Sequence, residues 1–459
     1  MTLTSSTASI PDASAYTRAR GYPLFDALLN RRSRRFGEGM HMNGGPLAYT
    51  SPSAPRPLTL HEEAALAFSA CGLTGPTVAD MPFETGNVPE SGDGNCLMSL
   101  FGRTVPSADA VHAVSVFVIN DSGTWLLKRP QDISPSEMGD LVRSAREYQL
   151  VDVYERSRVQ ISAQRVEVAR DANVMLAFNK WASNRPGTTY FLPVSDVTAL
   201  TISAMFILFS ESMGVYVLDD RNGFAPAGLK RHARSRGGHL HDNPRGEHMQ
   251  VPLSFVEGVV HELAAIEQGM ILQNLGLMTQ ALGLGGFVHF AAHPYAWFEA
   301  LGFQTQPLAA TRTAGAGPIV KLMARLLGQD RTLPTAVGLE QNGRALLKPF
   351  CPPLYRSMEE AVLAFVAYKF GPGWGTFRDG GEHSLWRAPA TVQAGIPAYT
   401  ERQIAATVDC CEYIYKRYGR FPLSNGPFRT TVAYQAHHLD TSFYDRFYRP
   451  DGVGGRADA

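Results

Sequence analysis

This 459-residue sequence has no excess of charge of either sign. It has 42 lysine and arginine residues against 42 aspartate and glutamate residues. Proteins that bind nucleic acid or anionic membranes through a broad electrostatic surface usually carry a basic excess. The balance therefore argues against both kinds of partner, and we expect neither nucleic acid nor a membrane to bind.

Cysteine and long apolar runs are also scarce. The chain has five cysteines and no CxxC pair, which favours a reducing compartment over a disulfide framework. The most apolar run, at residues 201–218, is interrupted by Glu211 and is too short to cross a bilayer. The N-terminal residues lack the basic and apolar segments of a secretory signal. We expect a cytoplasmic protein.

Familiar catalytic motifs are missing as well. No GxSxG nucleophile elbow occurs, and no GxGxxG follows a predicted strand, so a dedicated Rossmann domain is not indicated. Histidine gives a rival signal, because imidazole and carboxylate groups are ligands for transition metals. The histidine groups comprise His232, His239, His241, Asp242 and His248, and then His437, His438 and Asp440. Exposed histidines in an arginine-rich loop are usually only solvated, so we assign no metal ligands and keep a metal-dependent enzyme as the less favoured alternative.

Local patterns predict most of the secondary structure. Thr59 can cap a helix, with Glu62 favouring its first turn and Gly72 ending it. Residues 113–121 and 123–130 are apolar runs separated by a short turn, which predicts a β-hairpin. Further helices are expected within residues 17–36, 136–183, 357–371 and 400–419, mixed structure at 188–220, a strand and turn at 334–353, and a loop at 76–104.

Residues 255–282 form the longest segment with helical apolar periodicity. The apolar stripe is wide, which predicts a helix buried on most sides. Gly269, Gly276 and Gly283 recur every seven residues, although a glycine inside a helix costs up to about 1 kcal/mol. Close approach by another helix or by a flat ligand would explain them. For Gly283, a C-terminal cap is an equally good explanation.

Four arginines and one serine lie together at residues 31–35. Guanidinium forks suit phosphate oxygens, and a serine hydroxyl adds a further donor. A phosphate-bearing cofactor is therefore one interpretation of this arginine segment. A solvated helix end is the other, and these residues taken alone favour it.

The order of several motifs resembles the FMN-dependent nitroreductase superfamily, most closely its branch of ring-dehydrogenating oxidases. The arginine segment comes first, a helix ending in Ala-Cys-Gly-Leu-Thr-Gly follows, and then a Pro-Ser-Ala loop leads into a strand. A long core helix ending in Gly-Leu-Gly completes the set. The resemblance covers roughly residues 24–305.

This resemblance implies FMN as the cofactor. Arg31, Arg32, Ser33 and Arg35 match the segment that holds the phosphate and ribityl chain, and Arg34 at the variable position is expected in water or in a salt bridge. Other reductases of the family carry Asn and Gln near the flavin edge, where this sequence has Ala110 and His112. The remaining implied cofactor-binding residues are Pro106, Ser107 and Ala108, then Gly283, Leu284, Gly285 and Gly286, and finally Arg344 and Lys348.

The resemblance also implies an α+β, nitroreductase-like fold: a mainly antiparallel sheet flanked by helices, with a long buried central helix. The expected function is an FMN-dependent oxidoreductase acting on a small organic substrate, with NAD(P)H or oxygen as the other redox partner, in a homodimer. A fold member that binds without turnover is the alternative, and no catalytic residue is identified. The expected divisions are a disordered N-terminus at 1–16, an FMN-binding domain at 17–317, a largely helical extension at 318–450 and a disordered tail at 451–459.

Overall fold

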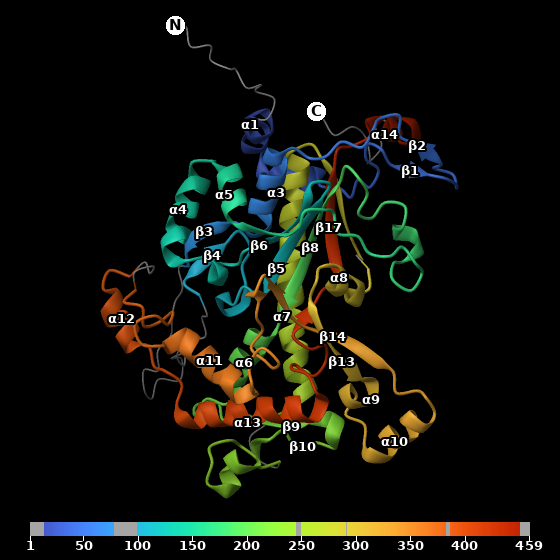
Figure 1. The fold of residues 1–459 in the computed structure, drawn as a ribbon. Helices are drawn as coiled ribbons and strands as arrows, with labels where there is room; N and C mark the ends of the chain where they lie inside the picture. Colours follow the sequence, from blue (N-terminus) through green and yellow to red (C-terminus); the bar gives the residue numbers. More distant parts are fainter. Residues whose placement is uncertain (1–12, 78–98, 245–248, 291, 382–385, 450–459) are drawn as a thin grey trace.

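The computed structural model describes residues 13–77, 99–244, 249–290, 292–381 and 386–449. Residues 1–12 of the predicted disordered N-terminus, the predicted disordered tail and most of the loop predicted at 76–104 therefore lie outside the described residues, whereas residues 13–16 belong to a helix. Helices and antiparallel strands alternate along the chain, which confirms the α+β class (Figure 1). No helix among the described residues is long and apolar enough to span a membrane.

A central antiparallel sheet organises the molecule. Its strands run in the order β12-β17-β8-β5-β6-β7, and β16 also pairs with β8. Their bounds are β5 (Val114–Asn120), β6 (Gly123–Leu127), β7 (Arg158–Ser162), β8 (Thr189–Asp196), β12 (Gly285–Phe290), β16 (Phe428–Arg429) and β17 (Val432–His437). The predicted hairpin is confirmed, because β5 and β6 pair antiparallel across a short turn, and the side chains on both faces of β5 are buried. The last strands of the chain thus lie inside the sheet, beside β8 and β12.

Two helices cover one face of this sheet. α3 (Leu60–Cys71) begins at a capping box in which the Thr59 hydroxyl accepts a hydrogen bond from the Glu62 amide at 3.2 Å, as predicted. α7 (Leu253–Ala281) packs beside α3, and Leu275 shares an apolar core with Phe191 of β8. The opposite face is covered by α8 (Pro294–Ala300) and by the hairpin β13 (Gln304–Ala309) and β14 (Thr332–Gln341).

A second apolar core joins the N-terminal half of α7 to three more helices, α6 (Thr198–Leu208), α11 (Met358–Phe370) and α13 (Glu401–Tyr418). The other helices are α1 (Ala13–Gly21), α2 (Leu24–Asn30), α4 (Pro135–Arg146), α5 (Leu150–Arg156), α9 (Ala310–Thr313), α10 (Pro318–Leu326), α12 (Pro389–Gly395) and α14 (Thr441–Phe447). The other strands are β1 (His41–Met42), β2 (Tyr49–Thr50), β3 (Leu73–Pro76), β4 (Phe101–Arg103), β9 (Tyr216–Asp219), β10 (Ala225–Pro226), β11 (Gln250–Pro252) and β15 (Arg344–Leu347).

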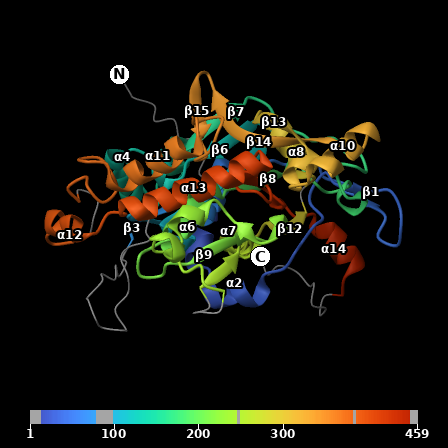
Figure 2. The ribbon, with the colours of Figure 1, turned by 90° about the horizontal axis from the view of Figure 1, so that it is seen from below.

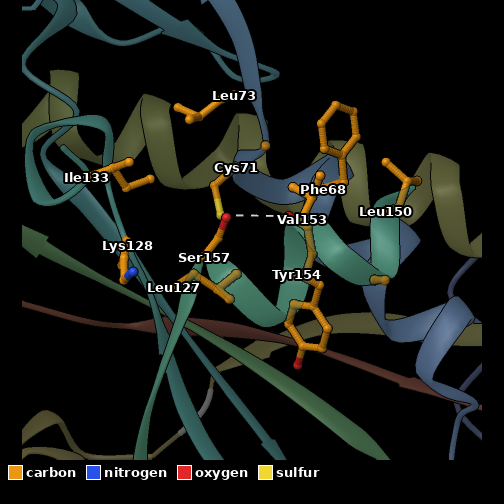
Figure 3. A pocket seen from close by; sticks show the side chains of 13 residues that line it. Phe68, Cys71, Leu73, Leu127, Lys128, Ile133, Leu150, Val153, Tyr154 and Ser157 are labelled. Atoms are coloured by element: carbon orange, nitrogen blue, oxygen red, sulfur yellow. Dashed lines mark hydrogen bonds between the residues drawn. The ribbon is translucent and has the colours of Figure 1, made fainter. Parts of the chain in front are cut away.

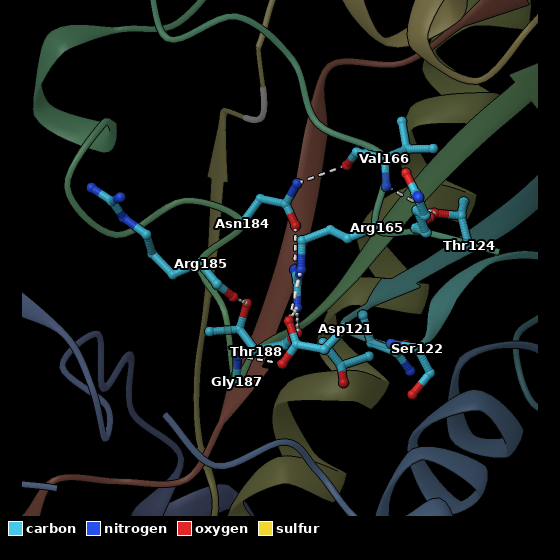
Figure 4. Close-up of polar contacts among 12 residues, drawn as sticks. Asp121, Ser122, Thr124, Arg165, Val166, Asn184, Arg185, Gly187 and Thr188 are labelled. Carbon is cyan, nitrogen blue, oxygen red and sulfur yellow. Dashed lines mark hydrogen bonds and ion pairs between the residues drawn. The ribbon is translucent and has the colours of Figure 1, made fainter. Parts of the chain in front are cut away.

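A buried arginine ties the β5–β6 turn to the loop that precedes β8 (Figure 4). The Arg165 guanidinium donates to Asp121 at 2.8 Å and to the side-chain oxygen of Asn184 at 2.6 Å. Asp121 in turn accepts a hydrogen bond from the Gly187 amide at 2.7 Å. These charge-assisted bonds fix a loop that has little regular structure of its own.

Three expectations about secondary structure are wrong in part. The helix predicted over 17–36 ends at Asn30, and the arginine segment after it is extended and bridges to β12. The predicted run of helices at 136–183 includes the strand β7. The helix α7 is not buried on most sides: Phe255 and Ile266 are 60% and 52% exposed, and they lie on one side of the helix together with Val259 and Met270. Periodicity locates an apolar stripe, but it does not say whether this chain itself covers it.

Candidate functional site

The arginine segment borders a cavity of about 200 Å³ between α7 and β12. The lining residues are Arg31, Arg32, Ser33, Gly269, Leu272, Gln273, Gly276, Gly286, Phe287, Val288 and Tyr434. The structure therefore brings three members of the arginine segment together with the glycine-rich strand start that the sequence singled out. We call this the arginine cavity.

Backbone pairing sets the direction of the arginine side chains. The Arg34 amide donates to the Gly286 carbonyl at 3.1 Å, so the segment runs as a short edge strand beside β12. Successive side chains of an extended segment point to opposite sides. Arg34 accordingly turns inward and is only 7% exposed, which contradicts the prediction that it lies in water or in a salt bridge.

The buried Arg34 guanidinium is electrically unbalanced. Its Nη1 atom has no hydrogen-bond partner among the described residues. Burial lowers the Arg34 pKa, and the nearby charge of Arg32 lowers it further. A buried cation without a partner is costly, so an anion bound beside this segment would be stabilised.

Two of the three spaced glycines form the wall of the cavity. A Cβ atom at Gly276 would lie 3.5 Å from the Arg31 side chain, whereas a Cβ atom at Gly269 would meet only open space. Gly286 of β12 also lines the cavity, and a Cβ atom there would collide with the Tyr434 side chain. Gly283 lies just beyond the end of α7 with a φ of +73°, so the alternative explanation, a C-terminal cap, holds for it.

Arg35 points away from the arginine cavity. Its Nη2 atom donates to the Asn179 side-chain oxygen at 3.1 Å, and its guanidinium carbon lies 4.5 Å from the centre of the Phe287 ring. Arg35 does not line the cavity that holds Arg31, Arg32 and Ser33. Its contacts are those of a residue that fixes the loop before β8 against β12.

The Pro106–His112 loop is anchored to α7 rather than to the arginine cavity. The Ser107 hydroxyl donates to the Glu267 carboxylate at 2.7 Å, and the buried Arg103 guanidinium also donates to that carboxylate. Ala110 and His112 both adopt positive φ angles, which are uncommon for residues other than glycine. The His112 ring bonds to the Phe101 carbonyl at 2.7 Å, and burial lowers its pKa to about 3.

Neither Arg344 nor Lys348 is brought to the arginine cavity. Arg344 begins β15 and is exposed. Lys348 lines a second cavity of about 190 Å³ together with Arg129, Asp132 and Asp196. Arg129 forms an ion pair with Asp132 at 3.0 Å, so the charges of that cavity are largely balanced within it.

A third cavity, of about 30 Å³, surrounds the Cys71 thiol between α3 and α5 (Figure 3). It has room for about one water molecule. Burial raises the Cys71 pKa to about 11, so this thiol stays protonated and weakly nucleophilic. This cavity is a packing defect and not a catalytic site.

The described members of the histidine groups do not assemble a metal site. His232 bonds to Asp409 at 2.8 Å, while His239 bonds to the Phe209 carbonyl at 3.0 Å. Within the described ranges, no three metal-ligating side chains come close enough to hold an ion. His248 lies outside the described residues. His437 is buried, and burial lowers its pKa to about 3, so it is neutral.

Sequence reasoning missed the apolar surface beside the arginine cavity. It consists of exposed side chains on α2, α7 and β12, namely Leu24, Phe25, Leu28 and Leu29, then Phe255, Val259, Ile266 and Met270, and Val288. Val288 belongs both to this surface and to the lining of the cavity, and Gly269 of α7 also lines the cavity. The apolar half of α2 could have signalled this surface, because α2 lies directly before the arginine segment.

Comparisons with known proteins add little to this picture. No protein-family model matches the chain, and no curated protein matches it. Among solved structures, the fold resembles that of a protein from Ralstonia eutropha JMP134 with a provisional assignment as a nitroreductase. The TM-score is 0.29 and the sequence identity is 14%, over 61% of this chain and 76% of that chain. A likeness at this level carries no argument about activity.

Proposed function

We propose that this protein is an FMN-dependent oxidoreductase with a nitroreductase-like fold. One observation carries the proposal: Arg31, Arg32 and Ser33 converge with Gly276 and Gly286 around one cavity. The order of sequence motifs that resembles the FMN-dependent nitroreductases supports it independently. Arg35, Arg344 and Lys348 are left out, because their side chains lie elsewhere.

The residues at the cavity fit a phosphate-bearing flavin. Arg31 and Arg32 supply guanidinium donors and Ser33 a hydroxyl, which are the groups that bind phosphate oxygens best. The unbalanced Arg34 guanidinium behind them favours an anion at this place. Gly269 leaves the helix wall open where a side chain would otherwise stand, so a flat group can approach the backbone closely.

The chain's own residues would bind and orient the cofactor. FMN, when bound, supplies the redox chemistry by accepting hydride from one substrate and giving it to another. Arg31, Arg32 and Ser33 would hold the phosphate end, and the backbone at Gly286 would approach the remainder. No described side chain is assigned as an acid or a base. The proposed contribution of the chain is therefore to hold the flavin and the substrate in position for hydride transfer.

We also propose that the protein is a homodimer formed through the apolar surface on α2, α7 and β12. A cavity of about 200 Å³ is smaller than the ~300–1,000 Å³ of typical ligand sites, so one chain alone encloses only part of an FMN molecule. The surface next to the cavity is large and apolar, as expected of an interface. A second copy of α7 packed there would complete the wall.

The absorbance spectrum of purified protein tests the flavin. We expect a yellow protein with flavin bands that bleach on adding NADH, NADPH or an oxidisable substrate. Arg31→Gln and Arg32→Gln should each weaken FMN binding by about 10-fold or more, since one charge-assisted contact contributes about 1.5–3 kcal/mol. Arg143→Gln is the matched control, because Arg143 is exposed on α4 and pairs with Asp140 at the surface. Colourless protein that rejects saturating FMN would exclude the proposal.

The alternatives predict other results. A protein that binds FMN yet neither accepts hydride nor turns over any substrate would be the scaffold alternative, which the Ala110 departure motivates. Metal retained after dialysis would support the alternative that the protein is a metal-dependent enzyme. In that case the ligands would have to include residues outside the described ranges, because the described ones form no cluster.

A further inference from the structure

A helical arm at residues 310–331 interrupts the β13–β14 hairpin. It holds α9 and α10, and Figures 1 and 2 show α10 projecting from the body of the molecule. The base of the arm is well bonded: the Thr311 amide and hydroxyl donate to Asp330 at 3.0 and 2.9 Å. Arg417 of α13 donates to the Gly315 carbonyl at 3.2 Å, so the arm is held in place. Because the base of the arm is fixed by these bonds, the exposed position of α10 is part of the folded structure.

The apolar face of α10 is uncovered. None of the residues of α10 is buried. The exposed apolar side chains are 55–77% accessible and comprise Ile319, Val320, Leu322, Met323, Leu326 and Leu327. At about 100° per residue they fill one side of the helix, and Lys321 and Arg325 lie on the other. Exposed apolar patches of this extent mark interaction sites.

The charge of the arm indicates what covers this face. Arg312, Lys321, Arg325 and Arg331 oppose the single acid Asp330, which gives 4 − 1 = +3 for residues 310–331, although the whole chain is neutral. Asp330 accepts a hydrogen bond from the Thr311 hydroxyl and lies 3.8 Å from the Arg325 guanidinium, so it balances only one of the four basic residues. An anionic surface is therefore favoured, and two arms of equal charge facing each other are disfavoured.

We propose that α10 docks on the surface of an anionic lipid bilayer, with its apolar side chains inserted at the level of the headgroups. A helix with basic residues on its polar side and leucines on the other matches the pattern of interfacial helices. The arm binds at the surface and does not cross the membrane, since α10 has 9 residues. This site is separate from the arginine cavity. It revises the expectation, drawn from the overall charge balance, that no membrane binds.

Sedimentation of the full-length protein with vesicles tests the proposal. We expect binding to phosphatidylcholine vesicles that contain phosphatidylglycerol, weak binding to phosphatidylcholine alone, and release by salt. Leu326→Gln should reduce the partition coefficient by about 10-fold or more, because it places an amide in the apolar face. Ala324→Gln is the matched control, about 200° away around the helix, and should change binding less than twofold. Lys321→Gln should reduce binding to the anionic vesicles by about fivefold.

Two results would overturn the proposal. One is equal binding, or none, to the two kinds of vesicle. The other is a Leu326→Gln variant that binds vesicles like the parent but forms a smaller oligomer by light scattering, since α10 would then be an interface between copies. Melting temperature and circular dichroism of each variant establish that it is folded. FMN absorbance reports on the arginine cavity separately, so either proposal can fail alone.

Discussion

Glu267 of α7 connects the central helix to the Pro106–His112 loop, and its removal should destabilise the protein strongly. The carboxylate is nearly fully buried and accepts hydrogen bonds from the Arg103 guanidinium, the Ser107 hydroxyl at 2.7 Å and the Val114 amide at 3.1 Å. In Glu267→Ala, Arg103 keeps only its bond to the Val114 carbonyl and becomes a buried charge without a counter-ion. Breaking a buried ion pair on one side costs about 3–5 kcal/mol.

Urea unfolding followed by circular dichroism measures this loss. A typical protein has about 5–15 kcal/mol of stability, so Glu267→Ala should lower the urea midpoint markedly and could unfold the chain at growth temperature. Glu155→Ala is the control, because Glu155 is exposed on α5 and should change stability by less than about 0.5 kcal/mol. Replacing both partners, as Arg103→Met with Glu267→Leu, should recover most of the loss. A cost below about 1 kcal/mol for Glu267→Ala, or a double variant no better than the single one, would refute the reasoning.

Three further predictions concern stability and assembly. Thr59→Ala removes the side-chain half of the α3 capping box and should cost about 1 kcal/mol in thermal or urea unfolding; an unchanged midpoint would contradict the cap. Burial lowers the pKa of His112 and His437 to about 3, so the unfolded chain takes up more protons below its own histidine pKa near ~6.5. The free energy of unfolding should therefore be highest above pH ~6.5 and fall toward pH 3, with a loss of about 2 kcal/mol per histidine at pH 5. Urea titrations at several pH values measure this dependence, and His437→Leu should make it less steep. A variant whose stability falls as steeply as that of the parent would count against burial of this imidazole. Ile266→Glu places a charge in the apolar surface of α7 and should convert the proposed dimer to a monomer by light scattering while lowering FMN retention; a variant that stays dimeric would place the interface elsewhere.

Several elements were predictable because their signals are local. The β5–β6 hairpin follows from two apolar runs around a short turn, and α3 follows from Thr59 and Glu62 three residues apart. The helical period over 255–282 located α7 within two residues at its N-terminal end and within one at its C-terminal end. Of the residues selected from the arginine segment and the glycines, Arg31, Arg32, Ser33, Gly269, Gly276 and Gly286 line one cavity, whereas Arg35 and Gly283 do not. The FMN assigned to them remains a prediction.

Other features depended on contacts between distant parts of the chain. β17 lies between β12 and β8, and the sequence patterns predicted no strand at its residues. β17 is stabilised by pairing with strands that are far away in the sequence, so its own residues carry no local pattern that predicts this pairing. The boundary predicted at residue 317 falls inside the α9–α10 arm and remains untested.

The sequence by itself determined which residue types are concentrated where: the arginines before a glycine-rich strand, a long apolar helix, and too few cysteines for a disulfide framework. Only the tertiary structure decided their directions. One backbone bond between Arg34 and Gly286 sends Arg34 inward, while Arg31, Arg32 and Ser33 line the cavity and Arg35 lies against Phe287. Tertiary structure also decided which apolar faces are left uncovered, on α7 and on α10. The physical reason is that periodicity defines a face of a helix or strand, whereas burial depends on whether another part of the molecule reaches that face.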